Sequence, residues 1–155
     1  MARTAGTPHK DSEGHVDMNA WLVVAAAGQA GLTAVAQIRL ALQRIPAVLS
    51  GEADPRAVAN DPESYPQRTL KYARNLTNQY ESPVLFLACI AVALAAGLSG
   101  PVLVGLAYAW LVTRAAHMAI HTGSNDVRLR FLAFAAGFVI LLAMWGVLAV
   151  AAITG

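Results

Sequence analysis

The stretch FLAFAAGFVILLAMWGVLAVAAI, residues 131–153, contains no charged residue. An α-helix needs about 20 residues to cross about 30 Å of hydrocarbon, so this stretch is long enough to span a bilayer. The rest of the chain agrees, because 57% of its 155 residues are hydrophobic and only 13% are charged. This composition is too apolar for an ordinary soluble domain, and it indicates further membrane spans.

Three further apolar runs precede this segment, at residues 20–36, 83–98 and 101–112. The run at 83–98 would measure only about 24 Å as a helix, so it must extend backward by about one turn. The run at 101–112 must likewise continue to about residue 120. These extensions bring polar side chains to membrane depth: Asn78 and Glu81 in the second helix, and Arg114 and His117 in the third.

We therefore predict an all-α integral membrane protein, a bundle of four transmembrane helices surrounded by the lipid bilayer. The length of the chain favours a single membrane domain at residues 18–155, preceded by a polar tail at residues 1–17. The segment at 46–67 contains four prolines and is predicted to be the one substantial loop. Its length suggests a lid or a subunit contact.

The distribution of lysine and arginine predicts the orientation. The connections between spans one and two and between spans three and four carry most of these residues, so the positive-inside rule places both in the cytoplasm. Both termini then lie on the non-cytoplasmic side, and a bacterial chain would lie in the inner membrane. Because the basic excess follows this topology, it gives no indication of a nucleic-acid partner. The cytoplasmic set is Arg39, Arg44, Arg56, Arg68, Lys71, Arg74, Arg114, Arg128 and Arg130, against Arg3 and Lys10 on the other side.

The segment RNLTNQYE, residues 74–81, carries ionisable and amide side chains into the second span. At 100° per residue, Arg74, Asn78 and Glu81 fall on one face of a continuous helix. We expect this face to point into the bundle, because a carboxylate that faces lipid costs several kcal/mol. Pro83 removes a backbone donor and is expected to kink the helix near Glu81.

The third span carries a second polar stripe, with Arg114, His117 and His121 on one face. Both stripes reach the cytoplasmic end, where the fourth helix begins with Arg128 and Arg130. A cluster of arginines suits an anionic ligand, and a guanidinium beside a bound thiol favours the thiolate. His117 and His121 also have metal-ligand spacing, but the sequence offers too few other ligands nearby, so no metal site is predicted.

Structural roles are the alternative for several of these residues. Gln29 and Thr33 in the first span are expected to hold neighbouring helices together, as polar residues in membrane helices commonly do. Glu81 can form a buried ion pair with Arg74 or Arg114 that serves stability alone. Physical reasoning from the residues stops at an anionic, thiol-bearing ligand near the cytoplasmic end.

Four features resemble the MAPEG family, the membrane-associated proteins of eicosanoid and glutathione metabolism. AQIRL at 36–40 is similar to the end of that family's first helix, and RNLTNQYE at 74–81 is similar to its second-helix signature. LVTRAAHMAIHTG at 111–123 closely resembles the third-helix pattern of prostaglandin E synthases. Arg130 falls where the family places its thiol-activating arginine. The resemblance covers roughly residues 20–150 in the same order.

The resemblance implies a homotrimer of four-helix subunits that holds glutathione between neighbouring subunits near the cytoplasmic face. It also implies a transferase or peroxidase reaction with a lipophilic electrophile that arrives from the bilayer. Arg130 would be the catalytic residue, because it would stabilise the glutathione thiolate. By motif position, the residues that would bind glutathione are Arg74, Asn78, Glu81, Arg114 and His117, with Arg39 nearby and His121 in the place of a family tyrosine.

Departures from the family pattern favour an alternative, a non-catalytic protein of the same fold with lost or altered ligand binding. His121 and Phe134 stand where many members have tyrosines. Pro83 follows Glu81 after a single residue, whereas the enzymes usually have three between. A small transporter is less favoured, because the sequence shows no inverted repeat.

Overall fold

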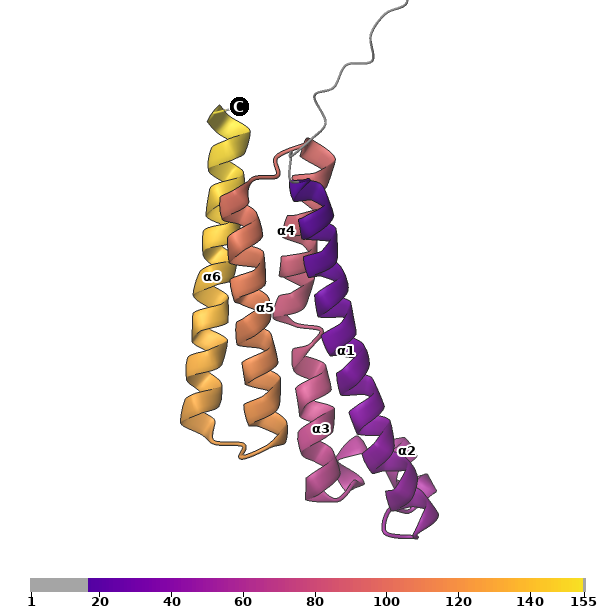
Figure 1. Ribbon diagram of the computed structural model, residues 1–155. Helices are drawn as coiled ribbons and strands as arrows, with labels where there is room; N and C mark the ends of the chain where they lie inside the picture. The colour runs from indigo at the N-terminus through magenta and orange to yellow at the C-terminus, as the bar shows by residue number, and fades with distance from the viewer. Residues whose placement is uncertain (1–16, 155) are drawn as a thin grey trace, which may run out of the picture.

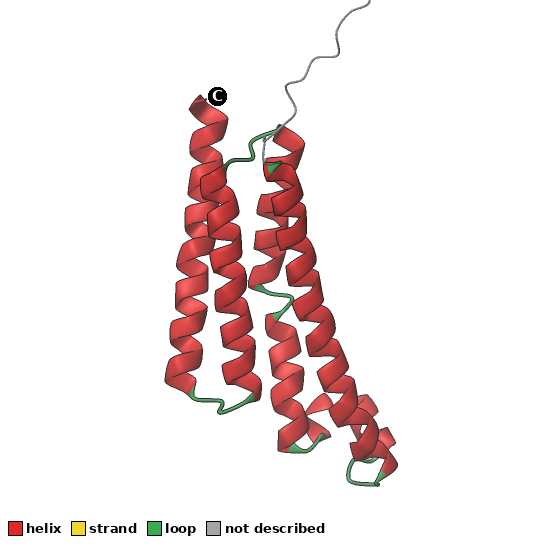
Figure 2. Ribbon diagram, in the orientation of Figure 1, coloured by secondary structure: helices red, strands yellow, loops and turns green. Residues whose placement is uncertain are grey.

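A computed structural model of the chain describes residues 17–154, and these residues contain helices and turns but no strand (Figure 2). Four helical segments are long and apolar enough to cross a membrane, so the predicted all-α bundle of four transmembrane helices is confirmed. Most of the predicted polar tail, with Arg3 and Lys10, lies outside the described residues. The elements are α1 (Met18–Leu49), α2 (Pro55–Asn60), η1 (Pro62–Ser64), α3 (Gln67–Asn78), α4 (Ser82–Ala96), α5 (Pro101–Thr122) and α6 (Val127–Thr154).

The four spans form two layers of paired helices that lie side by side (Figure 1). α1 runs along α3 and α4, and α5 packs against α6 as an antiparallel hairpin. The beginning of α1 and the end of α6 lie at one end of the bundle. The short helix α2, the beginning of α3 and the turn between α5 and α6 lie at the opposite end.

A stacked aromatic pair lies in the core of the bundle. The rings of Phe86 in α4 and Trp110 in α5 are nearly parallel, with centroids 4.0 Å apart and an interplanar angle of 8°. Both side chains are fully buried, as are Leu22 of α1 and Met144 of α6. Each span therefore contributes a large apolar side chain to one core, and close van der Waals packing of this kind is what holds helices together in lipid.

The second span consists of two helices rather than one. α3 ends at Asn78 and α4 begins at Ser82, with a tight turn between them (Figure 2). Pro83 cannot continue α3, because its ring would clash with the carbonyl of Gln79, and it fits the second position of α4, where a missing N–H needs no partner. The predicted kink is thus a complete break. The prediction that Glu81 continues the helical face of α3 is therefore wrong.

The predicted loop at residues 46–67 is also shorter than expected, because α1 continues through Pro46 to Leu49. Pro46 lies in the last turns of the helix, so its missing N–H interrupts only the end of the hydrogen-bond ladder. The remaining connection folds into α2 and η1. Each of these short helices begins after an aspartate whose carboxylate accepts a backbone N–H at 3.0 Å, Asp54 from Arg56 and Asp61 from Glu63.

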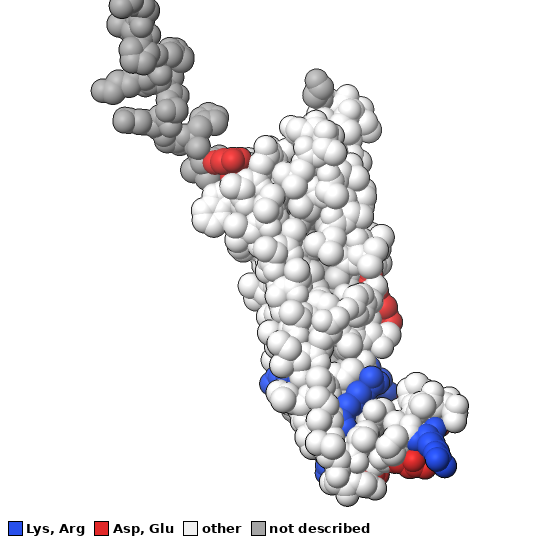
Figure 3. Space-filling view, turned by 90° about the vertical axis from the view of Figure 1, so that its right-hand side faces the viewer, with Lys and Arg blue, Asp and Glu red and all other residues white. Residues whose placement is uncertain are grey.

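Charged side chains gather at one end of the molecule, whereas most of the shaft is uncharged on the face that Figure 3 shows. The ends of α1, α3, α5 and α6 that meet there, together with α2, carry all the lysines and arginines of residues 17–154. We call this end of the bundle the basic end. In chain order, its first arginine is Arg39 of α1 and its last is Arg130 of α6. The fold thus brings both predicted polar stripes to one level of the bundle.

Candidate functional site

A cavity of about 380 Å³ opens at the basic end between α3, α5 and α6. We call it the basic cavity. Five of the eight predicted site residues line it: Arg74 and Asn78 from α3, His117 and His121 from α5, and Arg130 from α6. The other lining residues are apolar and all belong to the first turns of α6, namely Val127, Phe131 and Phe134. Polar groups on two helices therefore face a largely apolar third wall.

Arg114 lies behind the cavity and supports its α3 wall. The residue is 2% exposed, and its Nη2 donates a 2.6 Å hydrogen bond to the backbone oxygen of Asn78. The break after Asn78 leaves the last carbonyls of α3 without helical partners, and a cation is well suited to this negative end of a helix. The guanidinium carbon of Arg114 also lies 5.7 Å from the centre of the Trp110 ring. Arg114 therefore holds the end of α3 against α5.

Two buried imidazoles form the α5 wall of the cavity. The rings of His117 and His121 lie one helical turn apart, with centroids separated by 5.7 Å. Asn78 Nδ2 lies 3.3 Å from His121 Nδ1, so the amide donates to the ring when the His121 proton is on Nε2. His117 Nδ1 is buried and has no hydrogen-bond partner among the described residues. An atom of this kind is a group that a bound molecule can satisfy.

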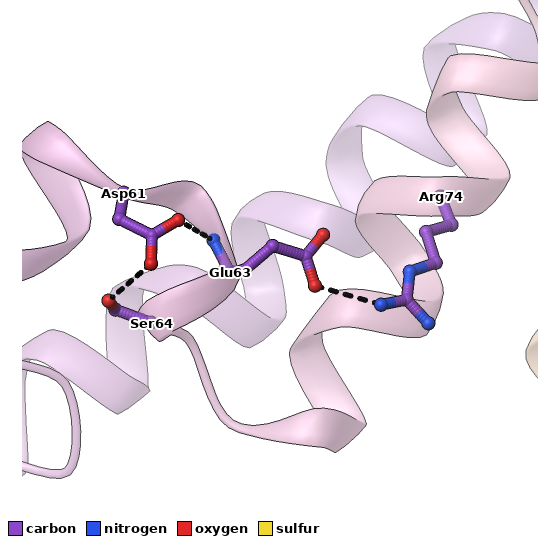
Figure 4. Close-up of polar contacts among 4 residues, drawn as sticks. All are labelled: Asp61, Glu63, Ser64 and Arg74. Atoms are coloured by element: carbon purple, nitrogen blue, oxygen red, sulfur yellow. Dashed lines mark hydrogen bonds and ion pairs between the residues drawn. The ribbon is translucent and has the colours of Figure 1, made fainter.

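An acidic residue of the α1–α3 connection holds one arginine of the cavity (Figure 4). Arg74 Nη2 lies 2.8 Å from Glu63 Oε2. Glu63 belongs to η1, which Asp61 caps by accepting from Glu63 N at 3.0 Å and from the Ser64 hydroxyl at 3.2 Å. Both charged side chains are more than half exposed, so the pair contributes at most about 1 kcal/mol. Arg74 can therefore exchange this carboxylate for another anion at little cost.

Arg130 lies at the rim of the cavity, in the first turn of α6. Its Nη1 donates to Asn125 Oδ1 at 2.8 Å. Asn125 has a φ of 53°, a left-handed conformation that asparagine tolerates better than most residues. Asp126 then caps α6 by accepting from Arg128 N at 2.8 Å and from Leu129 N at 3.1 Å. The turn before α6 thus both starts the helix and orients the Arg130 guanidinium.

Besides Arg114, two predicted site residues lie outside the cavity lining. Arg39 of α1 donates from Nη1 to Thr122 Oγ1 at 3.1 Å, at the end of α5. Glu81 lies in the break between α3 and α4, is exposed, and belongs to neither ion pair found among residues 17–154. The predicted pairing of Glu81 with Arg74 or Arg114 is therefore absent within residues 17–154. The break explains this, because it removes Glu81 from the helical face that carries Arg74.

Sequence reasoning missed two contributions to the cavity. Glu63 was missed because helical periodicity says nothing about how a 3₁₀ turn in a connection lies relative to α3. The α6 wall was recognised only through Arg130 and Phe134. A usable signal was present, since Val127, Arg130, Phe131 and Phe134 follow the i, i+3, i+4, i+7 spacing of one helical face.

The MAPEG family model matches residues 22–150 of this chain. The match extends from the first turns of α1 to the last turns of α6, so it includes all four spans and every residue of the basic cavity. No curated protein and no solved structure matches the chain.

Proposed function

Because this chain belongs to the MAPEG family, we propose that the basic cavity binds glutathione and that the protein uses it as a cosubstrate. The proposed reaction is glutathione transfer to a lipophilic electrophile, or reduction of a lipophilic hydroperoxide. One observation carries this proposal: the guanidinium groups of Arg74 and Arg130 line the same cavity as two imidazoles, an amide and an apolar wall.

The polar groups of the cavity suit the chemistry of glutathione, which has two carboxylates, an amine, two peptide groups and a thiol. A guanidinium can bind a carboxylate through two parallel hydrogen bonds, so Arg74 is assigned to a glutathione carboxylate in place of Glu63. The Asn78 side chain supplies an amide for the peptide groups. His117 Nδ1, buried and without a described partner, supplies a further polar contact.

Arg130 is assigned to the thiol. A free thiol has a pKa of about 8.5, and a fixed cation beside it favours the thiolate, which is the reactive nucleophile. In the transfer reaction, the thiolate sulfur forms a bond to the electrophilic carbon, and the leaving group departs with its electron pair. The side chains of Phe131 and Phe134 beside Arg130 give the lipophilic substrate an apolar surface next to the sulfur. The chain's own thiol, Cys89, is buried in α4 and lies outside this cavity.

We further propose that the protein assembles as a homotrimer, with each site completed by a neighbouring subunit. Arg39 and Glu81 support this assembly, because both are exposed and neither lines the cavity of its own subunit. A carboxylate exposed at membrane depth is costly, and a neighbouring subunit can cover it. Native mass spectrometry in mild detergent tests the assembly, and a stable monomer with intact helicity would contradict it.

Calorimetric titration of the purified protein with glutathione tests the proposed function most directly. We expect saturable binding in the millimolar range or below. Ultraviolet difference spectra across a pH series then report the thiolate, and Arg130→Ala should suppress its absorbance while leaving binding largely intact. If the wild-type protein shows no saturable binding at millimolar glutathione, the catalytic proposal fails.

The second candidate function is that of a non-catalytic MAPEG protein with lost or altered ligand binding. A specific observation favours it: His121 and Phe134 both line the cavity, at positions where the family resemblance implies tyrosines. The cavity then lacks two phenolic hydroxyl groups that can donate hydrogen bonds. Saturable binding of glutathione without turnover of any electrophile would support this candidate over the first.

A further inference from the structure

α1 is longer than a bilayer requires. Its 32 residues measure about 48 Å at 1.5 Å per residue, whereas the hydrocarbon core is about 30 Å thick. If Met18 lies at one hydrocarbon boundary, the other boundary falls near residue 38. The last turns of α1 therefore extend into the headgroup region at the basic end.

An apolar stripe continues along this extension. Ile38, Leu42, Ile45 and Leu49 are 60%, 64%, 58% and 81% exposed, respectively. At 100° per residue they fall within a sector of about 60°, so they form one continuous line along the helix. The subunit itself leaves this line uncovered, although it extends past the expected hydrocarbon boundary. Exposing these apolar side chains to water costs free energy, and covering them with an acyl chain recovers it.

The stripe ends at a pocket whose lining includes the cationic side chain of Arg44. The pocket has a volume of about 250 Å³ and is lined by Arg44, Ile45, Val48, Leu49 and Tyr65, so it shares Ile45 and Leu49 with the stripe. The guanidinium carbon of Arg44 lies 5.0 Å from the centre of the Tyr65 ring. Within residues 17–154, Arg44 makes no side-chain hydrogen bond and no ion pair, and its Nε is buried without a partner.

Four other arginines of the basic end differ in this respect, whereas Arg56 and Arg128 also have no side-chain partner within residues 17–154 but do not line this pocket. Arg68 is paired with Glu52, and Arg74 is paired with Glu63. Arg114 and Arg130 donate to oxygen atoms of nearby residues. Arg44 instead has its hydrogen-bonding capacity unused at a pocket with apolar walls. This combination fits an amphipathic anion better than a water-soluble one.

We propose that this pocket binds the phosphate of an anionic phospholipid, with one acyl chain lying along the stripe from Leu49 towards Ile38. A guanidinium binds phosphate oxygens through paired hydrogen bonds, and the Tyr65 ring holds it in place. The depth agrees, because Arg44 lies six residues, or about 9 Å, beyond residue 38, at the level of the headgroups. Anionic lipids are enriched in the cytoplasmic leaflet, which the basic end faces in the expected orientation. This site is separate from the basic cavity and does not depend on glutathione binding.

Native mass spectrometry of the full-length protein tests the proposal with two lipids of identical acyl chains, phosphatidylglycerol and phosphatidylcholine. We expect the wild-type protein to retain phosphatidylglycerol preferentially. Arg44→Gln should lower that retention about fivefold, the effect of one cation near an anionic lipid. Arg56→Gln is the matched control, because it removes an exposed cation of the same end that does not line this pocket, and it should change retention less than twofold. Arg44→Lys keeps the charge without the paired donors and should give an intermediate value.

Three results would overturn the proposal. Equal losses for Arg44→Gln and Arg56→Gln would indicate general electrostatic attraction without a site. Competition by soluble glycerol phosphate as strong as competition by the lipid would indicate a phosphate site to which the stripe contributes nothing. A change in the number of subunits in Arg44→Gln, with lipid retention unchanged, would indicate that a second copy of the chain covers the stripe. If Arg44→Gln folds poorly, the test rests on Arg44→Lys. That variant should keep the helicity of the wild-type protein and still retain less phosphatidylglycerol.

Discussion

Two cavities of nearly equal volume lie at opposite ends of the bundle. The basic cavity measures about 380 Å³, and a cavity of about 390 Å³ lies between the α4–α5 turn and the end of α6. The first is lined by two arginines, two histidines and an asparagine, in addition to its apolar wall. The second is lined by glycine, proline and aliphatic residues, with Ser99 and Thr154 as its only side-chain hydrogen-bonding groups. Volume therefore does not distinguish them, whereas the chemistry of their walls does.

The two ends also differ in how their walls are held. Glycine and proline form the α4–α5 turn, and Gly97 ends α4 in the left-handed conformation with φ 68°. At the basic end, three walls are fixed by polar contacts: Arg114 to the end of α3, Asn78 to His121, and Asn125 to Arg130. A site that must orient a ligand needs side chains whose positions are fixed in this way. This difference is why we place function at the basic end.

The largest effect is expected from removing a cation of the basic cavity. Arg74→Ala should weaken glutathione binding by about 2–3 kcal/mol, because a ligand carboxylate loses its charged partner. This is the lower part of the usual range, since the Arg74 side chain is 58% exposed. Calorimetric titration measures the change, with Arg56→Ala as a charge-matched control outside the cavity. Equal weakening in both variants would show that charge at this end, and not the cavity, attracts the ligand.

The second effect concerns the support of the α3 wall. Arg114→Gln should lower the free energy of unfolding by about 1.5–3 kcal/mol, because it removes a buried charged hydrogen bond to Asn78. Glu81→Gln removes no contact within residues 17–154, since Glu81 is exposed and belongs to neither ion pair there, so the single chain gives no reason for a comparable loss. Thermal unfolding followed by circular dichroism in detergent compares the two variants. If both lower the melting temperature equally, Glu81 has a buried partner in the assembled protein.

A third comparison tests the packing of α5 against α6. A Cβ added to Gly137 would lie 2.7 Å from Thr113 Oγ1, whereas one added to Gly146 would meet nothing within 4 Å. Gly137→Ala should therefore destabilise the protein by about 1–3 kcal/mol through overpacking. Gly146→Ala is the matched control and should not destabilise it. Thermal unfolding of the two variants provides the measurement, and similar melting temperatures would mean that α6 can shift to accommodate the methyl group.

The smallest effect is expected at the α1–α3 connection. Glu63→Gln should tighten glutathione binding by up to about fivefold, because the ligand carboxylate no longer competes with Glu63 for Arg74. Glu52→Gln is the matched control, since Glu52 pairs with Arg68, which does not line the cavity. Titration at two salt concentrations sharpens the test, because the gain should shrink as salt screens the pair. Weaker binding in Glu63→Gln would instead assign Glu63 to the ligand itself.

Much of the fold could be predicted from local sequence patterns. The charge-free run at 131–153 and the shorter run at 101–112 predict spans, because bilayer thickness sets the length of an apolar helix. The direction of each span follows from the one before it, so the polar stripes of α3 and α5 were expected at one end. Within α3, the shared face of Arg74 and Asn78 followed from helical periodicity, and both residues line the cavity.

Prediction failed where the assumption of a continuous helix failed. Glu81 was placed on the face of α3, but Pro83 begins a new helix and the chain turns before it. Pro46 has the opposite outcome, since α1 continues through it. A proline in the sequence indicates a missing backbone N–H and a steric clash with the preceding turn. Whether the helix ends there depends on which other groups can donate to the backbone carbonyls left without a helical partner. At the end of α3 the backbone oxygen of Asn78 accepts from Arg114, which lies 36 residues away in the sequence.

The sequence by itself determined that this protein is a four-span membrane bundle with its basic residues at one end, because hydrophobic length and charge placement are local properties of the chain. The tertiary structure decided which of those basic residues share a cavity. Arg74 of α3 and Arg130 of α6 line one cavity, Arg39 donates to Thr122, and Arg44 lies beside Tyr65. These pairings join residues that are distant in the chain, so they depend on how helices pack and where one of them breaks, which no local pattern specifies.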